Sequence, residues 1–200
     1  MQKQILTTIV IVGLFTGCKS FDPKFLSPTG NPFNPKLPSM ERYIENNLVA
    51  IVTTTGQSVG ASPQDVLTLF DREVSEIMTN PYGDKKGFLL LKVNTIENKL
   101  SVWQWIVSGT LMFTPTLLGL PLFSTKAVVE IQIDVMNNNR TLIGSYKGSS
   151  EKRMKSGLYI KDSYRELSRV CYLLAVKQAI EDAKSKMTPD LNRLVAELNK

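Results

Sequence analysis

The chain of 200 residues contains no histidine and only two cysteines, Cys18 and Cys171. The absence of histidine removes the commonest general base, the commonest metal ligand and the usual pH switch. If Cys18 is modified, Cys171 has no partner in the chain, and its apolar neighbours predict a small buried side chain and no disulfide. We therefore expect no cofactor, no metal site and no histidine-dependent catalysis.

Catalytic patterns in the sequence give no stronger signal. Without histidine, a serine or cysteine nucleophile would need a lysine or an acid as its base. Gly56–Gly60 lacks the lysine and the helix start that a phosphate-binding loop requires. The acids lie scattered along faces where solvated side chains are expected, although an acid pair built from distant positions is not excluded. The sequence thus predicts a protein that is not an enzyme.

The first 17 residues have the order of an export signal, with Lys3 followed by an uncharged run from Ile5 to Phe15. A helix of that length measures roughly 16 Å, about half the hydrocarbon thickness of a bilayer, so residues 1–17 are predicted to be a signal peptide. Phe15-Thr16-Gly17-Cys18 resembles the lipobox of bacterial lipoproteins, although Phe15 stands where that family more often has leucine. The resemblance implies a diacylglycerol on Cys18 after cleavage; the alternative is an ordinary secretory signal.

The resemblance to the lipobox also bears on location and partners. Lys19 is not the aspartate that usually retains lipoproteins in the inner membrane, so the outer membrane is preferred for this envelope lipoprotein. The formal net charge of +6 favours anionic surfaces such as phospholipid head groups. It is too diffuse to predict nucleic-acid binding. The expected partners are the membrane, through the lipid, and an unidentified envelope protein.

A tether is expected to join the lipid to a single domain. Residues 18–38 contain half of the prolines of the chain, which favours an extended segment over a folded one. Phe21, Phe25 and Phe33 in this segment would contact the bilayer or dock on the domain. Residues 39–200 are long enough for one domain with a core of its own.

The domain is predicted to have an α+β fold, with an antiparallel sheet of three to four strands covered on one face by helices. The helices expected from spacing and capping residues are 40–52 in part, 62–78, a long helix from the capping box Ser163–Glu166, and a short helix after Pro189. The expected strands are 87–97, 127–136 and 141–148, followed by a basic loop. Alternation predicts that Ile131 and Ile133 face Leu174 and that Glu130 and Asp134 face water.

An apolar insertion at residues 100–125 carries no charge between Lys99 and Lys126. A helix from Trp103 to about Phe113, followed by a Pro/Gly loop, is the expected conformation. Three interpretations remain open: a buried helical hairpin, an exposed lobe that dips into the bilayer, and a true membrane span. The candidate membrane or ligand contacts are Trp103, Trp105, Phe113, Leu117, Leu120 and Phe123.

Two further stretches support a family resemblance. Ser108–Tyr146, with its Leu118-Gly-Leu-Pro121 turn, and Gly157–Ile180 resemble a group of small uncharacterised bacterial envelope lipoproteins. The order of elements is also distantly similar to the α/β domains of curli-secretion-type lipoproteins, which act as assembly parts. The resemblance implies an architecture and brings no activity with it.

A second candidate surface is the basic run formed by Lys147, Lys152, Arg153 and Lys155, which would contact anionic head groups or remain a solvated loop. The leading functional hypothesis is a non-enzymatic, membrane-anchored lipoprotein that serves as an interaction or assembly part. A binding module for a lipid or another apolar ligand is the alternative. A hydrolase of envelope polymers comes third.

Overall fold

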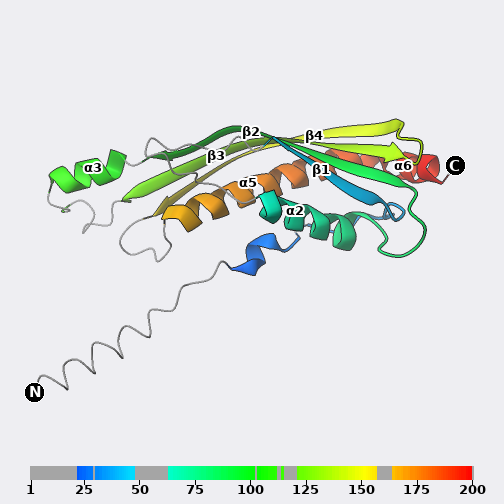
Figure 1. Cartoon of the computed structure of the whole chain (residues 1–200), viewed down its shortest axis with the longest axis horizontal. Helices are drawn as coiled ribbons and strands as arrows, with labels where there is room; N and C mark the ends of the chain where they lie inside the picture. Colours follow the sequence, from blue (N-terminus) through cyan, green and yellow to red (C-terminus); the bar gives the residue numbers. More distant parts are fainter. Residues whose placement is uncertain are drawn as a thin grey trace, which may run out of the picture.

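The structure is a computed structural model that describes residues 22–28, 30–47, 63–101, 103–111, 114, 121–156 and 164–199. Its centre is a four-stranded sheet in the order β1-β2-β3-β4, with helices packed on one face (Figure 1). The strands are β1 (Glu41–Asn47), β2 (Gly87–Ser101), β3 (Phe123–Asn137) and β4 (Leu142–Ser156). The helices are η1 (Pro23–Leu26), α2 (Pro63–Arg72), η2 (Glu73–Met78), α3 (Trp103–Thr110), α5 (Tyr164–Met187), η3 (Thr188–Asp190) and α6 (Leu191–Leu198).

The predicted α+β class is confirmed, but the sheet is mixed where a purely antiparallel one was expected. β2, β3 and β4 pair in antiparallel fashion, whereas β1 pairs with β2 in parallel. Parallel neighbours need a long crossover between them, and α2 and η2 lie in the segment that joins β1 to β2. The π-helix η2 continues α2, as the apolar spacing up to Met78 predicted.

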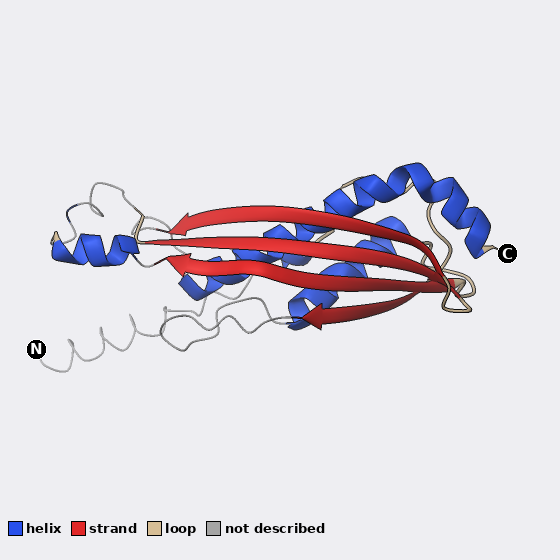
Figure 2. Cartoon of the chain, turned by 90° about the horizontal axis from the view of Figure 1, so that it is seen from above, coloured by secondary structure: helices blue, strands red, loops and turns tan. Residues whose placement is uncertain are grey.

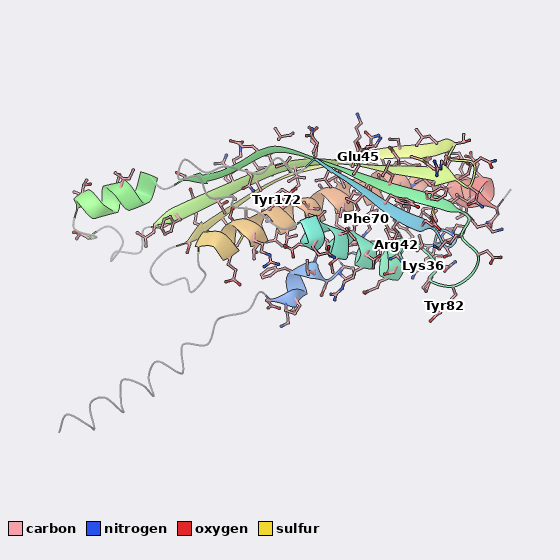
Figure 3. All side chains as sticks on the ribbon, in the orientation of Figure 1. Lys36, Arg42, Glu45, Phe70, Tyr82 and Tyr172 are labelled. Carbon is pink, nitrogen blue, oxygen red and sulfur yellow. The ribbon has the colours of Figure 1, made fainter. Side chains whose placement is uncertain are left out.

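The core lies between the sheet and α5, which runs along the strands β3 and β4 (Figures 1 and 2). Ile131 and Ile133 point into it, as alternation predicted. Leu174 on α5 is only half-buried, and Gly148, which pairs with Ile131, lies against Ala179, so the predicted contact with Leu174 was placed too early along the helix. Tyr172 and Phe70, labelled in Figure 3, are both buried, and the Tyr172 hydroxyl lies 2.9 Å from Thr95 Oγ1.

Two secondary-structure predictions were wrong. Residues 41–47 form β1 and not a helix, because Met40 and Ile44 face the helices at alternate positions while Tyr43 faces the other side. The expected helical spacing had combined residues from both faces of a strand. The predicted basic loop belongs to β4, which continues to Ser156. Its polar composition fits a strand that has a neighbour on one side only.

The described part of the proline-rich segment packs on the domain, which is the docking that the sequence left open for its phenylalanines. Its main chain bonds to the end of η2, with Phe33 N–H donating to Ile77 O at 3.0 Å and Leu37 N–H donating to Met78 O at 3.0 Å. The side chains of Phe33 and Leu37 are both buried. We call residues 30–40 the strap. Cys18 and Phe21 lie outside the described residues.

The apolar insertion leaves the sheet at its far end. β2 and β3 stay paired up to Ser101 and Ser124, so the two ends of the insertion lie side by side, which excludes a single membrane crossing between them. α3 projects beyond the strands (Figure 1), and Ile106 and Leu111 are 46% and 54% exposed. These exposures contradict a buried hairpin for the described part. Among the described residues, no helix combines the length and apolar composition that a membrane crossing needs.

Candidate functional site

The face of the sheet opposite the helices is the main candidate surface, and Figure 2 shows its strands in front of the helices. No described element covers this face, which we call the bare face. Strand register places its side chains in rows that cross the sheet. The rows change in chemistry along the strands, from apolar to polar to charged.

An apolar patch occupies the end of the bare face near the β3–β4 turn. It consists of Tyr43, Phe88, Leu90, Met136 and Leu142, which come from all four strands. The rings of Tyr43 and Phe88 lie 5.8 Å apart between centroids. Tyr43 is 52% exposed and Leu142 is 54% exposed, so the patch is open to solvent. Clustered exposed apolar side chains of this kind mark interaction surfaces more often than isolated ones do.

Asp134 lies beside the apolar patch and is buried, although alternation predicted that it faces water. Its carboxylate accepts hydrogen bonds from Ser145 Oγ at 2.6 Å and Gln132 Nε2 at 2.8 Å, and it pairs with Lys92 Nζ at 3.0 Å. Burial raises the pKa of Asp134, but these three partners outweigh burial and hold the pKa below its ordinary value. The carboxylate of Asp134 is therefore charged, and its neighbours on the bare face both cover it and supply its hydrogen bonds and its ion pair.

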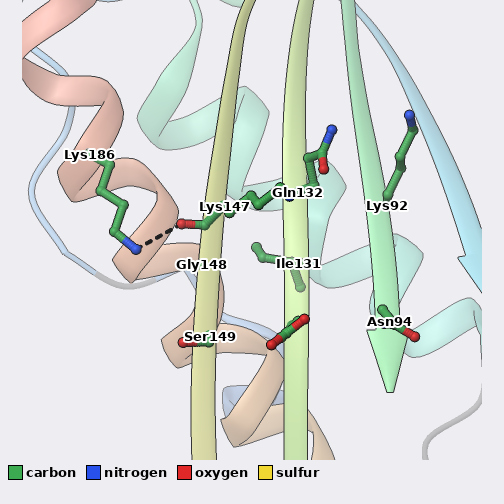
Figure 4. Close-up of a pocket in the computed structure, with 9 residues that line it drawn as sticks. Lys92, Asn94, Ile131, Gln132, Lys147, Gly148, Ser149 and Lys186 are labelled. Atoms are coloured by element: carbon green, nitrogen blue, oxygen red, sulfur yellow. Dashed lines mark hydrogen bonds between the residues drawn. The ribbon is translucent and has the colours of Figure 1, made fainter. Parts of the chain in front are cut away.

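A shallow hollow of about 460 Å³ follows along the strands (Figure 4). It is lined by Lys92, Asn94, Glu130, Ile131, Gln132, Lys147, Gly148, Ser149 and Lys186. The lining mixes cations, an acid and amides, which suits a polar or charged group of a partner better than an apolar ligand. Among the described residues, no group of His, Cys, Asp or Glu is arranged to hold a metal ion.

The predicted basic run does not form one cluster. Lys147, Arg153 and Lys155 point to the bare face, whereas Lys152 is half-buried on the helix side. Lys147 lines the hollow, and Arg153 lies roughly 20 Å farther along the strand at about 3.3 Å per residue. Contact of these residues with anionic head groups stays a prediction.

The predicted membrane or ligand contacts lie in or next to the insertion. Trp103 and Trp105 belong to α3, and Phe123 is half-buried at the start of β3. Phe113, Leu117 and Leu120 lie outside the described residues. Because α3 projects beyond the sheet, the described part of the insertion does not cover the core as the lid of an apolar cavity would. Their contact with a membrane or ligand stays a prediction.

Two sequence patterns typical of serine nucleophiles occur in the chain and are not among the predicted sites. Gly56–Gly60 has the spacing Gly-x-Ser-x-Gly and lies outside the described residues. Ser149–Lys152 has the spacing Ser-x-x-Lys, which brings the two side chains together on a helix. Here both residues belong to β4, where Ser149 faces the bare side and Lys152 the helix side. Lys152 is therefore not placed to take the proton of Ser149.

A buried tyrosine on the helix side gives a pH-dependent prediction. Burial, and then the hydrogen bond that Tyr146 Oη donates to Asp190 at 2.8 Å, raise the pKa of Tyr146 to about 12. Its contribution to stability is complete below the ordinary tyrosine pKa of about 10 and is lost as the pH rises from 10 to 12. In an ultraviolet titration of phenolate absorbance, Tyr146→Phe should remove a phenol that ionises at a pH of about 12, and it should weaken the alkaline loss of stability. Tyr82→Phe, at an 87% exposed position, is the control and should change neither.

No family model and no curated protein matches the chain.

Proposed function

We propose that this protein is a lipid-anchored envelope module, without enzymatic activity, that binds a partner protein through the bare face of its sheet. The observation that supports the proposal is the order of its layers. The bare face comes first, the helices α2 and α5 second, and η1 third (Figure 1). η1 contacts α2 and α5, and Lys177 Nζ donates to Ser27 O at 2.5 Å.

This order fixes an orientation if Cys18 carries the lipid. Three residues lie between Cys18 and Asp22, where the described chain begins, so four Cα-to-Cα steps join the two residues. At most about 3.6 Å each, these steps span roughly 14 Å. The helix side of the domain would then lie next to the bilayer, and the bare face would point away from it. A partner in the envelope could reach the apolar patch without displacing the anchor.

The chemistry of the bare face supports a protein partner. Tyr43 and Phe88 supply aromatic contact area, and Leu142 and Met136 extend it. Interfaces typically place such side chains at their centre and polar groups at the rim. The hollow beside the patch supplies that rim with lysines, amides and an acid.

A photo-crosslinking residue at Leu90 tests the proposal in intact cells. Leu90 lies within the apolar patch, and we expect a discrete adduct with one envelope protein. The matched position is Leu67, which is 46% exposed on α2 and should give no adduct with that protein. Adducts from Leu67 with none from Leu90 would contradict the proposed face.

The lipid anchor has a test of its own. In cells grown with a labelled fatty acid, the Cys18→Ser variant should not incorporate the label. Unchanged labelling of this variant would contradict a lipid on Cys18.

A further inference from the structure

The outer edge of β4 is covered by side chains along only half of its length. Three residues of α5 and α6 bond to main-chain groups that point away from β3. Arg193 Nη1 donates to Ile143 O at 3.0 Å, and Lys186 Nζ donates to Lys147 O at 2.9 Å. Asp182 Oδ2 accepts from Ser149 N–H at 3.1 Å. These contacts protect the first half of the edge from pairing with another strand.

The second half of this edge carries no such cover from the described residues. Pairing with β3 is unbroken from Gly144 to Ser156, so the alternation seen at Lys147 and Ser149 continues. The main-chain groups of Glu151, Arg153 and Lys155 therefore also point away from β3. In the described part of the chain, no side chain bonds to them. An extended peptide would find there the donors and acceptors of a strand without its neighbour.

The charges along this half select the kind of peptide. Arg153 and Lys155 lie on the bare side, and Lys152 lies on the helix side. The one acid, Glu151, pairs with Arg153 Nε at 2.9 Å and with Lys126 Nζ at 3.6 Å. The edge thus offers cations on both of its sides, complementary to a strand that carries carboxylates on both faces.

We infer that residues Glu151–Ser156 bind an extended acidic segment of a partner protein as a fifth strand of the sheet. Main-chain hydrogen bonds hold the segment, and its carboxylates pair with the cations on either side. The side chains that cover the first half of the β4 edge end the added strand at Ser149. They therefore set the register of that strand. The inference concerns an edge and not the bare face, and it goes beyond the proposed function.

Two other occupants fit this edge less well. A second copy of the chain, paired edge to edge about Arg153, would bring two segments together that each carry three cations and one acid, and it would place the two Arg153 side chains directly opposite each other, which is destabilising. Anionic head groups would neutralise the cationic side chains but would leave the main-chain donors and acceptors unused. The open main chain therefore favours a peptide.

The test separates main-chain pairing from charge at one position. Because Arg153 N–H points away from β3, Arg153→Pro removes an edge donor without breaking the bonds inside the sheet. Arg153→Gln removes the same charge and keeps the donor. Both variants of the full-length protein, purified in detergent, would be titrated with a fluorescent, capped heptapeptide of sequence TEETEET, which carries glutamates on both faces when it is extended. We expect Arg153→Pro to bind about tenfold more weakly than Arg153→Gln, the loss of roughly one hydrogen bond.

The controls make each outcome decisive. A peptide with lysine in place of glutamate should not bind, and amide hydrogen exchange at Glu151, Arg153 and Lys155 should slow when the acidic peptide is added. Equal losses in both variants, with no slowing of exchange, would overturn the inference. Vesicles of phosphatidylglycerol and phosphatidylethanolamine that displace the peptide and bind both variants equally would assign the cations to a membrane. A dimer that Arg153→Pro abolishes in sedimentation would assign the edge to a second copy.

Discussion

Replacing Gly148 by alanine is expected to destabilise the domain by about 3 kcal/mol or more, at the upper end of what overpacking usually costs. Gly148 lies on β4 where α5 approaches most closely. A Cβ there would lie 2.0 Å from Ala179 O and 2.8 Å from Ala183 N. Both contacts are with main-chain atoms of a long helix, so relief requires α5 to move away from the sheet and opens the core.

Denaturant unfolding followed by circular dichroism measures this loss. Gly109→Ala is the matched control, because a Cβ at Gly109 meets nothing within 4 Å. Gly109 belongs to α3, where alanine favours the helix by up to about 1 kcal/mol. A midpoint for Gly148→Ala as high as that of the control would show that α5 does not lie against β4 at this point.

Lys184→Met is expected to cost about 3–5 kcal/mol, the usual effect of removing one partner from a buried ion pair. Lys184 Nζ lies 3.2 Å from Glu73 Oε2 and 2.7 Å from Glu181 Oε1. The Glu73 side chain is 0% exposed and the Lys184 side chain 4% exposed. Without the ammonium group, the charge of Glu73 stays in the interior without its main compensation.

Two further variants show whether the loss comes from the charge. Lys85→Met removes an ion pair with Glu41 at a side chain that is 61% exposed, and it should leave the stability nearly unchanged because solvent screens the pair. Combining Lys184→Met with Glu73→Leu should recover part of the lost stability, because the charge that needed a partner is gone. If the double variant is no more stable than Lys184→Met in denaturant titrations, the loss arises from packing and not from charge.

The elements with a strong period were predictable from the sequence. The alternation of Val129 to Val135 predicted β3, and the capping box formed by Ser163 and Glu166 predicted the start of α5. β1 was missed because Met40, Tyr43 and Ile44, which lie just before and inside this seven-residue strand, fit helical spacing equally well. The docking of the strap stayed undecided because prolines disfavour regular structure without excluding docking, and the main-chain partners of Leu37 lie at the end of η2, far along the chain.

The candidate surface was less predictable than the fold. Its rows arise from strand register, and residues such as Tyr43, Leu90 and Asp134 carry no local signal that they are neighbours. Asp134 is buried because Lys92 and Ser145 reach it from two other strands. One available signal was overlooked, since a glycine inside a strand, such as Gly148, often marks a close approach of another backbone.

The insertion at the tip of β2 and β3 has a consequence for how this domain varies. The two strands are already paired where the chain departs at Ser101 and again where it returns at Ser124. The segment between these residues therefore joins the domain at a point where the two strands are already paired. Its length and composition can change during evolution while the strands, α5 and the strap keep their contacts, and a short turn in its place would leave an ordinary hairpin.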